Sequence, residues 1–342
     1  MDTSPFLRAC RREPVERTPV WLMRQAGRML PEYRAMRQRL SLLDLCKAPD
    51  AAAEITVLPV DRLGVDAAII FADILLVVEP LGVGLEFAKG EGPTIRRPVR
   101  TAADVDRLPD VQPEDETGFV FEAVRRARLA LDGRVPLIGF AGGPFTVASY
   151  LVEGGPSRDF VATKQLMRSD PVVWRRLMDK LTTLTLRYLA GQIAAGAQAV
   201  QIFDSWIGCL APEDYRRQVL PFTRRLIAGL GGPVPVIHFG TGTAGLLELM
   251  REAGGDVIGL DWRVDLDRAW RRVGEDVGVQ GNLDPSILLA DPGEIRRAVR
   301  DILSRAAGRP GHIFNLGHGI LPQTPWQHAA ALVEIVREES AR

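Results

Sequence analysis

The chain has 342 residues, 46% of them hydrophobic, and 43 basic residues balance 43 acidic ones, so its formal net charge is zero. This balance argues against a nucleic-acid or membrane-surface partner that binds through bulk charge. The sequence contains no apolar stretch of membrane-spanning length and no signal-peptide core near its start. Cys10, Cys46 and Cys209 form no C-x-x-C pair, so neither a disulfide framework nor a zinc ribbon is indicated. We therefore expect a cytoplasmic protein without nucleic-acid or membrane partners.

Short apolar runs alternate with longer amphipathic segments, which is the pattern of a parallel sheet covered by helices. The runs are nearly continuous in Val, Ile, Leu and Phe, as expected of strands buried on both faces. They occupy residues 19–23, 67–71, 136–140, 199–203, 234–239, 256–260, 278–281 and 312–316. Eight strands with intervening helices predict a single-domain (β/α)8 TIM barrel over residues 1–342. An open doubly wound sheet, which usually has fewer strands, is the alternative.

Residues 79–113 interrupt this alternation with proline and glycine. Short β-rich stretches at residues 86–88 and 94–96 flank the sequence KGEGP, which is typical of a turn. We therefore expect a hairpin insertion after strand two, near the mouth of the barrel.

Helix signals stand between the later strands. A stripe at helical spacing is formed by Tyr215, Val219, Phe222 and Leu226, and glycines follow it. Asp291 followed by Pro292 predicts an N-cap with proline in the first helical turn. These signals support helices that cover the outside of the sheet.

The ends of the predicted strands carry polar or turn-forming residues. In chain order they are Arg24 and Arg28, Asp73, Gly142 and Gly143, Asp204 and Ser205, His238, Asp261 and Trp262, Asn282 and Asp284, and Asn315 and His318. Active sites of α/β barrels form at the carboxyl ends of the strands. The shared position of these residues therefore indicates a site on this face.

Arg24 and Arg28 lie four residues apart in the first loop, and a guanidinium matches a carboxylate with two parallel hydrogen bonds. We interpret this pair as an anion-binding site. Arg34 and Arg37 follow on the next helix, where a solvated helix face is an equally good interpretation. Asp73 either faces the barrel mouth or caps the next helix.

Other chemistries receive little support from the motifs. The glycine-rich turn around His318 suits a phosphosugar enzyme, but no lysine stands at a predicted strand end for Schiff-base chemistry. His238 has no cysteine or second histidine at metal-ligand spacing. Nucleotide-binding and serine-hydrolase motifs are absent from the sequence. The residues themselves thus predict a barrel with an arginine-rich mouth, an anionic small-molecule ligand and no cofactor.

Two long motifs carry a family resemblance. PVWLMRQAGRMLPEYR (residues 19–34) and GFAGGPFTVASYLVEGG (139–155) resemble the two signatures of the uroporphyrinogen decarboxylases. FADIL (71–75), FDSWIG (203–208), QGNLDP (280–285) and NLGHGI (315–320) match in order and spacing. The resemblance covers essentially the whole chain. It departs only slightly, with Met29 where an aromatic residue is commoner and Ala72 where serine is usual.

The resemblance implies a homodimeric carboxy-lyase of porphyrin and haem biosynthesis. Its substrate would be uroporphyrinogen III, whose four acetates become methyl groups to give coproporphyrinogen III and CO2 without metal or organic cofactor. The resemblance implies catalytic roles for Arg24, Asp73, Tyr150 and His318. The implied substrate-binding set is Arg24, Gln25, Ala26, Gly27, Arg28, Arg37, Phe71, Asp73, Tyr150, Ser205 and His318.

The chemistry of Asp73 agrees with this assignment. Four pyrrole N–H groups converge on the centre of the macrocycle, and an ionised carboxylate offers about four acceptor positions. The identity of the proton donor stays open between Arg24, Tyr150 and His318. Two other functions also stay open: a zinc-dependent methyltransferase on the same barrel, although HFGTG (238–242) lacks a cysteine two positions on, and a non-catalytic tetrapyrrole carrier.

Overall fold

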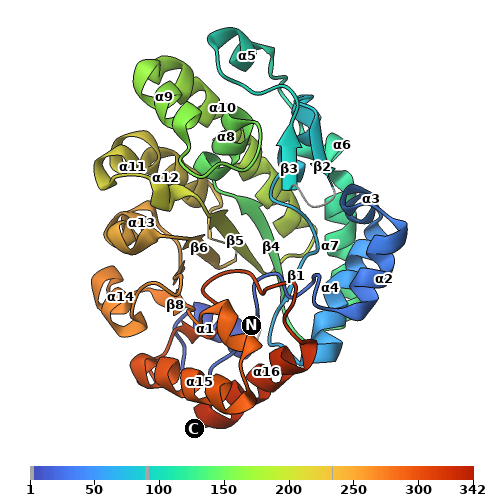
Figure 1. The fold of residues 1–342 in the computed structure, drawn as a ribbon, viewed down its shortest axis with the longest axis vertical. Helices are drawn as coiled ribbons and strands as arrows, with labels where there is room; N and C mark the ends of the chain where they lie inside the picture. The colour runs from blue at the N-terminus through green and yellow to red at the C-terminus, as the bar shows by residue number, and fades with distance from the viewer. Residues whose placement is uncertain (1–3, 89–91, 233) are drawn as a thin grey trace.

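The structure is a computed structural model that describes residues 4–88, 92–232 and 234–342. Seven parallel strands form one curled sheet in the order β1-β4-β5-β6-β7-β8-β9, with helices around its outside (Figure 1). The strands are β1 (Ala68–Ile69), β4 (Leu137–Gly142), β5 (Ala199–Asp204), β6 (Val236–Gly240), β7 (Val257–Gly259), β8 (Gly278–Gln280) and β9 (His312–Ile313). The predicted α/β barrel class is confirmed.

The first predicted strand, residues 19–23, is not a regular strand. It contributes one parallel bridge, from Val20 to Phe314. The backbone N–H of Phe314 donates to the carbonyl of Pro19 at 2.9 Å, and that of Asp66 donates to the carbonyl of Val20 at 2.7 Å. This segment therefore lies between β9 and β1 and closes the barrel with few backbone bonds. We call residues 19–25 and 67–71 the seam, and β4 to β9 the arc.

The helices that cover the sheet differ greatly in length. They are α1 (Pro5–Cys10), α2 (Pro31–Arg39), α3 (Leu42–Lys47), α4 (Pro49–Leu63), α5 (Ala102–Arg107), α6 (Pro113–Glu116), α7 (Gly118–Leu131), α8 (Pro144–Glu153), α9 (Val161–Ser169), α10 (Pro171–Ala194), α11 (Pro212–Gln218), α12 (Leu220–Gly229), α13 (Leu247–Ala253), α14 (Leu266–Val273), α15 (Pro292–Ala306) and α16 (Trp326–Ser340). Short 3-10 turns are η1 (Leu76–Leu81), η2 (Ile207–Cys209), η3 (Thr243–Gly245) and η4 (Pro285–Leu289). None of the helices in the described ranges is long and apolar enough to cross a membrane.

Proline and side-chain caps explain where several helices begin. Proline stands in the first turn of α4, α8, α10 and α15, where its missing N–H breaks no helical bond. Asp291 caps α15 by accepting from the backbone N–H groups of Gly293 and Glu294, so the predicted cap is confirmed. The stripe from Tyr215 to Leu226 was expected to form one helix, and this is wrong. The chain breaks at Val219 (φ −128°), because Pro221 cannot continue the preceding helical hydrogen bonds.

A second sheet lies beside the barrel between η1 and α5. Its strands β2 (Leu85–Ala88) and β3 (Gly92–Ile95) pair antiparallel, and the backbone N–H of Ile95 donates to the carbonyl of Gly154 just beyond α8 at 2.8 Å. Residues 89–91 of the predicted turn lie outside the described residues. The pair stands at one end of the arc in Figure 1, next to α8. It is thereby placed to form one wall of a cavity at the strand ends.

Candidate active site

A cavity of about 420 Å³ lies at the carboxyl ends of the strands. The seam and the loops that follow it supply Arg24, Ala26, Gly27, Arg28, Ile69, Ile70, Phe71, Ala72, Asp73 and Ile74. The opposite wall holds Phe140, Tyr150, Phe203 and Ser205, and Phe87, Gly92 and Pro93 come from the β2–β3 sheet. Nine of the eleven residues predicted to bind substrate thus line one cavity; Gln25 and His318 do not.

The cavity forms where the sheet opens between β1 and β4. The last backbone bond between them joins the N–H of Ile70 to the carbonyl of Ile138 at 3.0 Å. Beyond it, the N–H of Phe71 donates to the Thr56 hydroxyl at 2.9 Å, while the Gln192 amide bonds both the N–H (2.8 Å) and the carbonyl (2.9 Å) of Phe140. These buried side chains satisfy backbone groups that a ladder would otherwise pair. The two strands can therefore separate without leaving those groups unpaired.

Two glycines shape the position of Arg24. Its backbone is left-handed (φ 63°), which is uncommon for a residue with a side chain. A Cβ on Gly27 would stand 2.7 Å from the Arg24 carbonyl oxygen, and a Cβ on Gly319 would clash with the Arg24 side chain. Glycine at both positions thus lets the backbone of Arg24 turn and its guanidinium extend across the turn that contains His318.

The cavity arginines have no carboxylate partners of their own. Most other arginines of the chain form ion pairs, such as Arg17 with Asp66 and Arg272 with Glu248. Within the described part of the chain, Arg24 and Arg28 form no ion pair within 4 Å, and Arg37 donates instead to the carbonyl of Leu40 at 2.6 Å. Their positive charge is available to a ligand, which suits a substrate with several carboxylates.

Asp73 lines the cavity and does not cap the following 3-10 turn η1, whose N-cap is Leu75 without a side-chain bond. The backbone N–H of Leu75 donates to Oδ1 of Asp73 at 2.9 Å, so one oxygen holds the turn before η1. Burial raises the pKa of Asp73 above the ordinary aspartate value, while the Leu75 N–H and the charge of Arg24 oppose that rise. Hydrogen-bond donors from a ligand would therefore favour the ionised form of this carboxylate.

Tyr150, on α8, lines the same cavity as Asp73. Its ring stacks against the indole of Trp206, with 3.9 Å between centroids and 33° between planes. Burial raises the pKa of the phenol, the negative charge of Asp73 raises it further, and Arg24 opposes both. The phenol therefore keeps its proton across the physiological range, and it lies within electrostatic reach of both charged groups.

Gln25 and His318 occupy other places. The Gln25 amide is fully buried; its oxygen accepts from the N–H of Leu22 and its nitrogen donates to the carbonyl of Ala67, both at 2.9 Å. We therefore assign it no contact with substrate. His318 is half-buried, edge-on to Trp262 at 6.2 Å. Burial and then the positive charge of Arg24 lower its pKa, which keeps the imidazole neutral near pH 7.

Other lining residues were missed by the sequence analysis, among them Tyr33 and Phe87. Tyr33 packs edge-on against Phe71 with 5.5 Å between centroids, and burial raises its pKa against the opposing charges of Arg37 and Arg28. It lies within the first long motif, so its position there was a usable signal. Phe87 belongs to β2, and the hairpin expected near the mouth of the barrel was a usable signal for its place in the wall.

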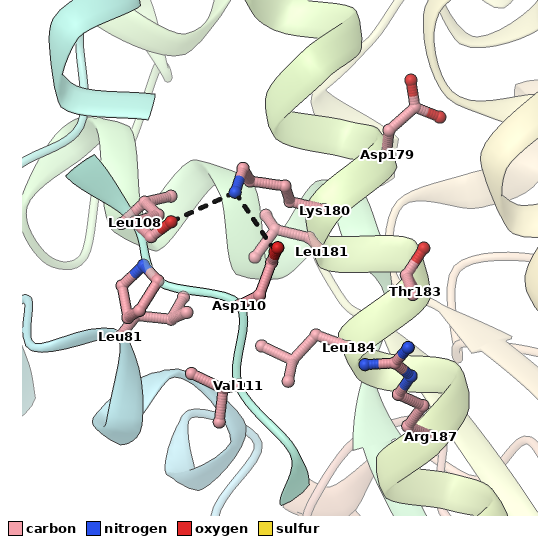
Figure 2. Close-up of a pocket in the computed structure, with 11 residues that line it drawn as sticks. Leu81, Leu108, Asp110, Val111, Asp179, Lys180, Leu181, Thr183, Leu184 and Arg187 are labelled. Carbon is pink, nitrogen blue, oxygen red and sulfur yellow. Dashed lines mark hydrogen bonds and ion pairs between the residues drawn. The ribbon is translucent and has the colours of Figure 1, made fainter. Parts of the chain in front are cut away.

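A second, smaller pocket of about 230 Å³ lies between α10 and the segment after α5 (Figure 2). Its charged groups already have partners. Lys180 donates to the carbonyl of Leu108 at 3.1 Å and to Asp110 at 3.4 Å, as Figure 2 shows. Asp179 pairs with Arg225, and Arg187 donates to Gln112. This pocket lies away from the strand ends, and its charged side chains already bond other groups of the protein.

Asp204 ends β5, whereas His238 was predicted at a strand end and lies within β6 instead. Asp204 and His238 are both fully buried, with 3.7 Å between Oδ2 and Nε2. In the described ranges, no three His, Cys, Asp or Glu side chains gather in a way that could hold a metal ion. His238 thus has one acidic neighbour rather than a ligand set.

Comparisons with known proteins agree with this geometry. The family model described as "Uroporphyrinogen decarboxylase (URO-D)" matches residues 1–339. A uroporphyrinogen decarboxylase of Sorangium cellulosum is 57% identical, covering 97% of this chain and 95% of the relative, and one of Carboxydothermus hydrogenoformans is 55% identical, covering 98% and 96%. A methyltransferase from Methanosarcina mazei shares the fold (TM-score 0.81, 97% of each chain) at 19% identity. The chain belongs to the uroporphyrinogen decarboxylase family.

Proposed function

We propose that this chain decarboxylates the four acetate side chains of uroporphyrinogen III, giving coproporphyrinogen III and CO2 in haem biosynthesis. Membership of the family supports the reaction. The cavity links this reaction to particular residues, because arginines without carboxylate partners line it together with the half-buried carboxylate of Asp73. An octacarboxylate with four central N–H donors fits that charge arrangement, because its rim is anionic and its centre is electropositive.

The proposed reaction needs an electron sink. Protonation of a pyrrole carbon beside the acetate-bearing carbon makes a cation. The C–C bond to the carboxylate then breaks, and its electron pair moves into the ring as CO2 leaves. A second proton adds to the exocyclic methylene and the first is lost from the ring, so each turn consumes one proton and releases one CO2.

In this proposal Asp73 accepts hydrogen bonds from the pyrrole N–H groups and stabilises the cationic ring. The same donors favour its ionised form, which burial alone disfavours. Arg24, Arg28 and Arg37 bind the substrate carboxylates, while Ala26, Gly27, Phe71 and Ser205 shape the walls. The proposed mechanism uses no cofactor.

Tyr150 and His318 receive different roles. Since Tyr150 keeps its proton, we assign it as a hydrogen-bond donor that orients the reacting acetate. Burial and the positive charge of Arg24 lower the pKa of His318, so if it were the proton donor, kcat would fall as the pH rises through a pKa below 6.5. A His318→Asn variant that keeps this pH dependence would exclude the imidazole as the donor.

The direct test is anaerobic incubation with uroporphyrinogen III in the dark with a chelator, followed by chromatography of the oxidised products. Stepwise loss from eight to four carboxylates would establish the reaction and its independence from metal. Tight binding without loss of carboxylates would favour the carrier. Activity that appears only with stoichiometric zinc would favour the methyltransferase.

We further propose that residues 1–342 act as one catalytic unit, that the protein is a cytoplasmic homodimer, and that no nucleic acid or membrane takes part. The family resemblance supports these assignments. Light scattering on the purified chain measures the oligomeric state directly, and the mass of one chain at micromolar concentration would contradict the dimer.

A further inference from the structure

Trp206 lies directly behind the proposed catalytic cavity without lining it. Its indole stacks on the Tyr150 ring at 3.9 Å, and Phe160 packs against it at 4.8 Å. Tyr150 lines the cavity, but Trp206 is not among the lining residues. The indole therefore touches a site residue through its ring rather than the substrate space.

A chain of hydrogen bonds holds Trp206 in this place. Its backbone N–H donates to the Thr146 hydroxyl at 3.3 Å, and that hydroxyl donates to Oδ1 of Asp204 at 3.1 Å. Asp204 is the fully buried last residue of β5, and a Cβ on Gly143 would clash with its carboxylate. The end of a laddered strand thus fixes the start of the loop that carries the indole.

The same bonds tie Trp206 to the helix of Tyr150. Thr146 and Tyr150 are both on α8, four residues apart and so on one face of it. Trp206 is consequently held to α8 twice, through its backbone at Thr146 and through its ring at Tyr150. A side chain that only filled space beside the cavity would need neither the hydrogen bond to Thr146 nor the ring contact with Tyr150.

We propose that Trp206 is a positioning residue for decarboxylation: its indole fixes the ring of Tyr150 so that the phenol points at the reacting acetate. This inference rests on the role proposed above for Tyr150. Without the indole, the Tyr150 ring keeps its place on α8 but loses the surface that restricts its rotation. We therefore expect kcat to fall and KM to change little, because the arginines that bind the substrate carboxylates are unchanged.

The test is a double-mutant cycle between Trp206→Leu and Tyr150→Phe, measured as kcat and KM for the first decarboxylation of uroporphyrinogen III. An aromatic pair of this kind corresponds to a roughly three- to tenfold fall in kcat for Trp206→Leu, with KM changed less than about twofold. Trp206→Phe retains a stacking ring and should restore most of kcat. In the Tyr150→Phe background, Trp206→Leu should change kcat by less than about twofold.

The control is Trp326→Leu, a half-buried tryptophan on α16 that contacts Arg62 and lies outside the cavity lining. It should leave kcat unchanged, and thermal unfolding of every variant checks that the fold is intact. If Tyr150→Phe alone leaves kcat unchanged, the role of Tyr150 is wrong and the inference falls with it. If Tyr150→Phe lowers kcat but Trp206→Leu has no effect, or has an additive one, the proposed reaction stands and the positioning role is overturned.

Discussion

The arc and the seam of the barrel are held together by different kinds of hydrogen bond. In the arc, β4 pairs with β5 and β5 with β6 over five residue pairs each. In the seam, β1 pairs with β4 over two residues, and the segment before it pairs with β9 through the single bridge at Val20. Within the arc the ladders shorten to two pairs between β8 and β9, the number found between β1 and β4, so the segment with the single bridge at Val20 is where a substitute is needed.

Side chains provide that substitute. Gln25 joins the two segments of the seam, and Oδ1 of Asn315 accepts from the N–H groups of Met23 at 3.0 Å and Leu316 at 2.8 Å. Oδ2 of Asp66 accepts from the N–H of Val20 at 2.8 Å. Because these bonds do not require neighbouring strands to stay parallel, the backbone can turn away from the sheet. The charged groups of the site stand at those turns, because Arg24 lies within the turn closed by Gln25 and Asp73 follows residues 67–71.

Replacement of Asp73 by Asn tests whether catalysis requires the negative charge that follows the seam. The change keeps the shape and removes the charge, and we expect turnover to fall by roughly 10²-fold or more, as loss of a preorganised charge typically does. Asp284→Asn is the matched control, because Asp284 also accepts from the N–H two residues on (2.8 Å) but lies outside the cavity lining. Initial rates of product formation measure both. Turnover near the unmutated level in Asp73→Asn would refute the central-carboxylate mechanism.

The Gln25→Leu variant tests the structural substitute itself. Leucine has a similar volume but leaves the N–H of Leu22 and the carbonyl of Ala67 buried without this partner. Each such group costs about 1–3 kcal/mol, so we expect the free energy of unfolding to fall by about 2–6 kcal/mol. Urea unfolding measures the difference, with the exposed Gln165→Leu as the control. A loss below about 0.5 kcal/mol would mean that the seam does not depend on this amide.

These observations also show how far the sequence could predict the molecule. Periodicity located all seven strands of the sheet, because a strand buried on both faces has a recognisable composition. It could not show that residues 19–23 pair through a single bridge, since pairing depends on partners far along the chain. The motifs brought Arg24 and Asp73 into one site. Gln25 stands in the same motif as Arg24 but supports the fold, and the spacing of motif residues does not show which of them line the cavity.

His312 marks the place where the arc meets the seam, and it gives a pH-dependent prediction. The imidazole is buried beside the Gly281 carbonyl (3.0 Å), and burial lowers its pKa from 6.5 to about 4. The unfolded chain therefore binds this proton first as the pH falls, so the folded state loses stability below about pH 6.5. Between pH 7 and pH 5 this group alone removes about 2 kcal/mol.

The His312→Gln variant retains an amide that can donate to Gly281 but does not titrate. Its free energy of unfolding should fall less than that of the parent chain between pH 7 and pH 5, by about 2 kcal/mol. Urea unfolding at the two pH values gives the comparison. Equal losses in the two proteins would assign the acid sensitivity to other groups.

The pH dependence of activity gives the smallest and most specific effect. Burial raises the pKa of Asp73 in the empty cavity, and the proposed mechanism requires the ionised carboxylate. We therefore expect kcat/KM to fall as the pH is lowered, with a midpoint above the ordinary pKa of aspartate. Bound substrate supplies N–H donors that favour the ionised form, so the acid limb of kcat should lie at lower pH than that of kcat/KM. Acid unfolding through His312 would lower both quantities together and cannot separate the two limbs. Coincident limbs in the pH profiles would therefore mean that the pyrrole N–H groups do not bind Asp73.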